Sequence, residues 1–123
     1  MFKVAIVGGE GFGDYEIFEQ DCIKCLRKKG KEGCGIMIYT TGDKFNDRFA
    51  MKFGVDLRYF NTEWQRYGQD ALKERNMKML ENLDAVIAFE DGLKDTEIFL
   101  DQAKDKKIPY RFFSKDNTVT KST

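Results

Sequence analysis

The sequence contains no histidine, and this absence restricts its chemistry more than any other feature of its composition. Without histidine the chain cannot form a Ser–His or Cys–His nucleophile pair, and it cannot bind a metal through imidazole. Any general acid or base must therefore be a carboxylate, a lysine or a tyrosine. The three cysteines are too few soft ligands for a zinc site. We therefore expect reduced, structural thiols at Cys22, Cys25 and Cys34, and no metal or other cofactor.

Surplus charge and long apolar runs are also missing. The 123 residues include 21 basic and 21 acidic side chains, so the chain lacks the excess positive charge on which most affinity for nucleic acid depends. No apolar stretch approaches the roughly 20 residues that span a bilayer, and the N-terminus does not have the pattern of a signal peptide. We therefore expect a cytoplasmic protein without a membrane partner, for which nucleic acid is not the expected partner either.

Short apolar runs alternate with stretches of helical periodicity along the chain. This order predicts an α/β fold: a single Rossmann-like domain of three layers, with a mostly parallel, five-stranded sheet and helices on both faces. The domain is expected to span residues 1–113, and a loosely held polar tail to span 114–123. The predicted strands are 2–7, 36–39, 55–60, 84–89 and 108–113, and the predicted helices are about 15–30, 48–53, 71–83 and 96–106.

Ligands of such sheets bind outside the carboxyl ends of the strands, near the point where the strand order reverses. Four segments are expected there: GGEGFGDY (8–15), TTGDKFND (40–47), NTEWQRYGQDALKERN (61–76) and FEDGLKDTE (89–97). The first is neither a dinucleotide fingerprint nor a Walker loop, because the required glycine or Gly-Lys pair is absent. Its backbone amides could hold an anion at a helix N-terminus, or its glycines could serve only a tight turn. The sequence leaves both alternatives open.

The third segment places two large aromatic residues close to a guanidinium and an amide. Trp64 and Tyr67 could stack on a base, while Arg75 and Asn76 hold a phosphate or a ribose. Alternatively, the aromatic rings could cover the edge of the sheet, while the arginine pairs with an acidic neighbour.

The pattern W-x-x-Y-G followed by A-x-x-x-R-N-x-x-M runs through this third segment. Together with the order of the other segments, it resembles the small YspA-like proteins of the SLOG superfamily over about residues 2–113. These are Rossmann-like domains related to the LOG cytokinin-activating hydrolases and to the DNA-processing protein DprA. The resemblance implies that a nucleotide or a nucleotide-derived signalling ligand binds at the carboxyl ends of the strands. The residues that match the pattern are Trp64, Tyr67, Gly68, Ala71, Arg75, Asn76 and Met79.

The resemblance assigns ligand-binding positions to all four segments, but the second and fourth depart from the family. The second has lost two of the family's three glycines, and the fourth, GLKDT, is one residue short of G-x-S-x-G-T. Either the pocket has been rebuilt, with Lys44, Lys94 or Arg75 supplying charge, or the ligand has been lost; we favour the first. The expected ligand-binding residues are Gly8, Gly9, Phe12, Asp14, Gly42, Lys44, Asp47, Trp64, Tyr67, Arg75, Asn76, Asp91, Gly92 and Thr96.

Three functions are compatible with these features. We expect foremost a binding protein that senses or sequesters a nucleotide-derived signal, as a small phage protein would do against host defence. The alternative is a LOG-like hydrolase of an N-glycosidic or phosphoribosyl bond, with Glu97 as its catalytic carboxylate. A second alternative is DprA-like binding of single-stranded DNA through the basic run at 27–31. Eleven phenylalanines and five tyrosines also suggest a homodimer or a higher homo-oligomer.

Overall fold

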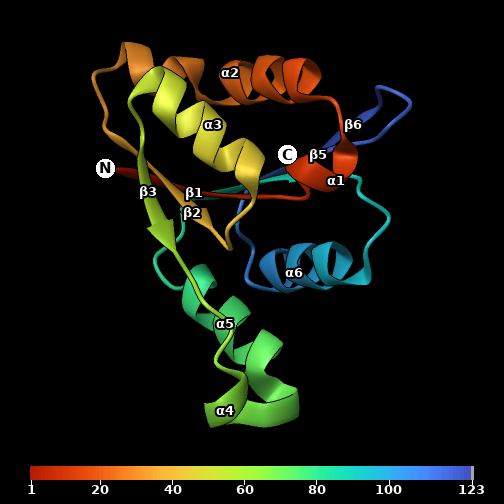
Figure 1. Cartoon of the computed structure of the whole chain (residues 1–123). Helices are drawn as coiled ribbons and strands as arrows, with labels where there is room; N and C mark the ends of the chain where they lie inside the picture. Colours follow the sequence, from red (N-terminus) through yellow and green to blue (C-terminus); the bar gives the residue numbers. More distant parts are fainter. Residues whose placement is uncertain (123) are drawn as a thin grey trace.

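A computed structural model describes residues 1–122 as one sheet between two layers of helices (Figure 1). The strands are β1 (Phe2–Val7), β2 (Ile36–Thr40), β3 (Asp56–Tyr59), β4 (Ala85–Phe89), β5 (Tyr110–Phe113) and β6 (Val119–Lys121). The helices are α1 (Gly9–Phe12), α2 (Tyr15–Lys31), α3 (Lys44–Phe53), α4 (Trp64–Tyr67), α5 (Ala71–Leu80) and α6 (Lys94–Asp105), with a 3₁₀ turn, η1 (Gly68–Asp70), between α4 and α5.

The strand order is β3-β2-β1-β4-β5-β6, and every neighbouring pair is parallel except β5 and β6. This confirms the predicted Rossmann-like α/β fold with a mostly parallel sheet. After β1 the chain adds β2 and then β3 on one side of the sheet. It then returns to add β4 on the other side of β1. The strand order therefore reverses at β1, which is where a ligand site is expected in a fold of this kind.

Two hydrophobic cores lie on opposite faces of the sheet, and alternate residues of β1 serve each of them. Val4 and Ile6 pack with Phe18 beneath α2 and α3, whereas Ala5 packs with Met79 beneath α5 and α6. Figure 1 shows these two helix pairs on opposite sides of the sheet. Because β1 is covered on both faces, its sequence is nearly continuously apolar.

The tail differs from the prediction, because it carries a sixth strand. Val119–Lys121 pairs antiparallel with β5, so the described part of segment 114–123 is tied to the domain rather than loosely held. All three residues of β6 are exposed, so no apolar alternation marks the strand in the sequence.

The turn predicted at 40–47 is also shorter than expected. Helix α3 begins at Lys44, because the Asp43 carboxylate accepts a hydrogen bond from the Phe45 amide and caps the helix. Lys44 and Asp47 therefore lie in the first turn of a helix, not in a loop.

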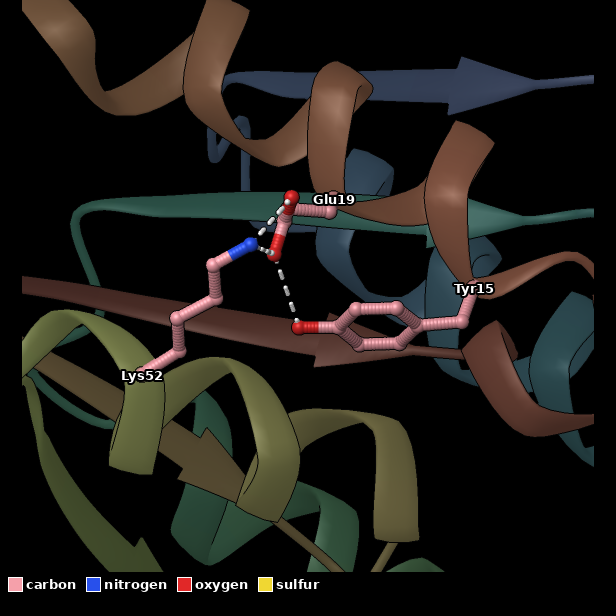
Figure 2. A network of polar contacts seen from close by, with 3 residues as sticks. All are labelled: Tyr15, Glu19 and Lys52. Atoms are coloured by element: carbon pink, nitrogen blue, oxygen red, sulfur yellow. Dashed lines mark hydrogen bonds and ion pairs between the residues drawn. The ribbon is translucent and has the colours of Figure 1, made fainter.

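A polar network joins the two helices that cover one face (Figure 2). The Lys52 ammonium on α3 lies 2.8 Å from a carboxylate oxygen of Glu19 on α2, and the Tyr15 hydroxyl donates to the same carboxylate at 3.1 Å. The Arg48 guanidinium lies 3.8 Å from the centre of the Tyr15 ring. Burial, aided by the hydrogen bond to Glu19, raises the pKa of Tyr15 to about 12.

We expect an ultraviolet titration of the folded protein to show one tyrosine that ionises with a pKa of about 12. This high ionisation step should be absent from the titration of the Tyr15→Phe variant. An unfolded tyrosine ionises near pH 10, so the unfolded chain releases its proton first. The free energy of unfolding should therefore fall as the pH rises from about 10 to about 12. In denaturant the step should return to about pH 10. Persistence of the high step in Tyr15→Phe would contradict the assignment.

Candidate functional site

A crevice of about 190 Å³ opens at the carboxyl end of β1, where the strand order reverses. Its walls come from the segments after β2 and β4, from α5 and from the first turns of α6. Four of the predicted site residues line it: Gly8, Arg75, Asp91 and Thr96. Three polar residues that the sequence analysis did not select line it as well: Thr41, Asp43 and Asp95.

The first glycine segment is shaped by packing. Gly8 has a φ of +83°, and a Cβ placed there would lie 2.3 Å from the carbonyl oxygen of Phe89. A Cβ on Gly9 would lie 2.5 Å from the ring of Phe18. Both glycines are therefore needed so that α1 can approach β4 and α2 closely. This favours the tight-turn alternative for the glycines.

Side-chain carboxylates of the chain itself accept hydrogen bonds from the backbone amides at which a phosphate would be expected to bind. The Glu10 amide donates to Asp43 at 3.0 Å, and the Lys44 amide donates to the Glu10 carboxylate at 3.3 Å. At the start of α2, the Asp14 carboxylate accepts from the Ile17 amide at 3.2 Å. Burial raises the pKa of Asp43, and its amide hydrogen bonds oppose this effect. These amides are therefore not free to cradle an anion.

The segment after β4 is organised by Asp91. One carboxylate oxygen accepts from the Leu93 amide at 2.9 Å, and the other accepts from the Thr96 hydroxyl at 2.7 Å. These bonds fix Asp91 and Thr96 against each other at the wall of the crevice. Asp95, on the first turn of α6, lines the crevice beside them.

Among residues 1–122, Arg75 is the only basic residue that lines the crevice. Its Nε and Nη2 donate to the Asn76 side-chain oxygen at 3.3 and 3.1 Å, and its Nη1 donates to the Thr62 hydroxyl at 3.0 Å. Asn76 is 2% exposed and donates in turn to Gln102. Within residues 1–122 no carboxylate lies within 4.0 Å of the guanidinium. Burial lowers the pKa of Arg75, and Asp95 partly offsets this.

The other predicted residues of the first two segments have structural contacts. The Phe12 ring packs on the ring of Phe89, with centroids 5.3 Å apart. Asp47 accepts from the Tyr59 hydroxyl at 2.8 Å. Lys44 is exposed, and its side chain does not line the crevice. Gly42 has a φ of +105° in the turn before α3 and does not line the crevice.

The aromatic residues of the third segment lie outside the crevice. Trp64 is 56% exposed on α4, which projects from the body of the sheet (Figure 1). The Lys78 ammonium lies over the Tyr67 ring, 5.4 Å from the centre of the ring. Their positions depend on the path of α4, which the sequence pattern could not supply.

In the fourth segment, Thr96 lines the crevice, but the predicted catalytic carboxylate beside it, Glu97, does not. Glu97 is exposed, whereas the preceding Thr96 is buried. Gly92 has a φ of +74° in the turn before α6. Asp43 could have been found as the capping residue that precedes an apolar helical stretch; no pattern marks Asp95.

Across residues 1–122, no group of three or more cysteine and carboxylate side chains is arranged to hold a metal ion. None of the helices described is both long enough and apolar enough to cross a membrane.

No protein-family model and no curated protein matches this chain. Among solved structures, the crystal structure of MurG from Acinetobacter baumannii is similar, with a TM-score of 0.58 and 12% sequence identity. The similarity covers 93% of this chain and 35% of that chain. At this identity the likeness shows the α/β fold alone.

We expect Gly8→Ala to be far more destabilising than Gly13→Ala. Both residues have positive φ angles, but a Cβ at Gly8 meets the Phe89 carbonyl, whereas a Cβ at Gly13 meets nothing within 4 Å. Backbone strain alone should cost Gly13→Ala about 1 kcal/mol. The added clash should bring Gly8→Ala to about 3 kcal/mol or more. Urea unfolding of the two variants measures the difference, and equal costs would refute the packing role of Gly8.

Proposed function

We propose that the chain binds a nucleotide or a nucleotide-derived ligand in the crevice, as a member of the SLOG superfamily that senses or sequesters its ligand. The observation that carries the proposal is Arg75, a half-buried cation at the reversal point of the sheet whose guanidinium is held in place by Thr62 and Asn76. The resemblance in sequence supports the same ligand class independently.

Burial of an unpaired cation is costly unless an anion joins it. Thr62 and Asn76 hold the guanidinium in one orientation, so little side-chain entropy is lost when a ligand binds. Because Nε and Nη2 already donate to Asn76, a phosphate or phosphodiester would accept from the remaining N–H groups of the two Nη atoms. Arg75 is therefore the residue to which the anionic group of the ligand would bind.

The remaining charge in the crevice limits which ligand is suitable. Asp43, Asp91 and Asp95 line it together with the single guanidinium. Carboxylates accept hydrogen bonds from ribose hydroxyls and base amino groups, but they repel a chain of several phosphates. A ligand with one negative charge, such as a cyclic nucleotide or another phosphodiester, therefore fits better than a nucleoside triphosphate.

The size of the crevice indicates that it encloses one part of the ligand. Its volume of about 190 Å³ is below the roughly 300 Å³ at which pockets for whole drug-sized molecules begin. Arg75 also borders a second hollow of about 430 Å³ between the end of β3 and α5, lined by Arg58 and Phe60. The rest of the ligand would extend from the arginine into this hollow.

A binding role fits this site better than hydrolysis does. Glu97, the carboxylate expected for a hydrolase, lies outside the crevice, and both oxygens of Asp91 are already hydrogen-bonded. No contact in the crevice favours single-stranded DNA. A cytoplasmic location, an anti-defence role in a phage and assembly into a homo-oligomer remain predictions that accompany this proposal.

The test is a thermal-shift series with cyclic AMP, cyclic GMP, ADP-ribose and ATP, combined with mass spectrometry of small molecules released on denaturation. A ligand at one hundred times its Kd should stabilise the fold by about 2.7 kcal/mol. Arg75→Lys keeps the charge but loses the fork, and should weaken binding by about tenfold or more. Arg66→Ala removes an exposed arginine on α4 and should leave binding unchanged.

The proposal fails if none of these compounds shifts the melting temperature and no nucleotide is released. Equal affinity of Arg75→Lys and the wild type would instead reject the assignment of the anion to Arg75. Conversion of the bound compound to a free base or a ribose phosphate would establish the hydrolase alternative.

A further inference from the structure

A larger hollow lies at the opposite end of the sheet from the crevice. Its volume is about 430 Å³, compared with about 190 Å³ for the crevice. It is bordered by Phe2, Ala85 and Tyr110, the first residues of β1, β4 and β5. Cys25 and Leu26 of α2 form one wall, and the hairpin of β5 and β6 forms the other.

The topology explains why this hollow is open. Helices α2 and α3 cover β1 and β2 on one face of the sheet, and α6 packs on the other face. None of the helices within residues 1–122 covers β5 and β6 on the α2 face. The floor of the hollow is apolar. The partly buried Phe2 and Ala85 form its surface, and Val4 and Ile87 lie beneath it, 0% and 3% exposed.

Among residues 1–122, the charged side chains that line this hollow are both basic: Arg111 and Lys121. Asp21 and Lys24 of α2 lie outside it and border a neighbouring hollow with Arg111. Arg111 and Lys121 are direct partners in the antiparallel register of β5 and β6, an arrangement in which like charges destabilise the pair. Neither side chain has a carboxylate within 4.0 Å in the part of the chain that the structure describes. An adjoining hollow of about 510 Å³ adds Lys104 and Lys107, again without a carboxylate.

We propose that this hollow is a second binding site, specific for an amphipathic organic anion. The apolar part of the ligand would lie on the floor, and its carboxylate or sulfonate would lie between Arg111 and Lys121. The volume is within the range of about 300–1,000 Å³ typical of small-molecule sites. The ligand anion would relieve the repulsion between the two cations, and burial of its chain would supply the remaining affinity. This site is independent of the crevice and of Arg75.

Cys25 supplies a built-in reporter for this site. Its sulfur lies 3.7 Å from a guanidinium nitrogen of Arg111, and it lines the hollow, whereas the partly exposed Cys34 does not. With decanoate as the probe, alkylation of Cys25 by iodoacetamide should slow by about tenfold at ten times the Kd, while alkylation of Cys34 stays unchanged. Peptide mass spectrometry measures both rates in one sample. Decanol and decyltrimethylammonium, which match the chain but not the charge, should protect Cys25 much less.

Charge variants separate the proposed contact from general binding of a fatty chain. Arg111→Gln and Lys121→Gln should each weaken decanoate binding by about fivefold to tenfold. Circular dichroism should show both variants to be folded, because each one removes a like-charge neighbour. The control is Lys73→Gln, which removes the same charge from an exposed position on α5 and should bind decanoate as the wild type does.

Three results would overturn the proposal. The first is an absence of protection of Cys25 by millimolar decanoate, and the second is equal protection of Cys34, which would indicate unspecific detergent binding. The third is unchanged affinity in both Arg111→Gln and Lys121→Gln. None of these results bears on nucleotide binding at Arg75, and a failure of nucleotide binding would not affect this site.

Discussion

The close approach of Gly8 to the Phe89 carbonyl determines how the centre of this protein is built. This contact joins the ends of β1 and β4, the two neighbouring strands between which the strand order reverses. With no side chain at Gly8, α1 can turn directly over the end of the sheet and place Phe12 on Phe89. The ring of Phe18 then packs on Phe89 from α2, with centroids 4.9 Å apart. The crevice is the space that remains on the other side of this contact.

At the carboxyl end of the sheet, backbone amides that bind phosphate in many other proteins bind carboxylates of this chain instead. Helix N-termini gather there, and in many proteins their free amides bind phosphate. In this chain Glu10, Asp14 and Asp43 already accept hydrogen bonds from those amides. These hydrogen bonds tie the loops together, and the carboxylates offset the positive ends of the helices. In the described part of the chain only Arg75 brings positive charge into the crevice, so the anion binding that we propose would depend on a side chain and not on a glycine loop.

The sequence predicted the parts of the fold that are buried on both faces. Strands β1 and β4 are apolar runs because two cores need them, and such runs are visible without a structure. Strand β6 was not predicted, because only pairing with β5 holds its exposed residues. In the site, Arg75 and Asp91 were predicted to be near the ligand and do line the crevice. Trp64 was predicted to be there too, but its position depends on tertiary packing at α4, which has no local pattern.

Although the net charge is zero, the crevice and the hollows at the two ends of the sheet differ in the charge of the side chains that line them. Three carboxylates line the crevice beside Arg75, whereas within residues 1–122 the charged side chains that line the hollows at the amino end are all basic. Helix dipoles favour this division, because acidic residues stabilise helix N-termini and basic residues stabilise C-termini. The dipoles do not explain Arg111 opposite Lys121, since both lie on strands. That pair is unfavourable in the free protein, and an external anion is the simplest partner that would make it favourable.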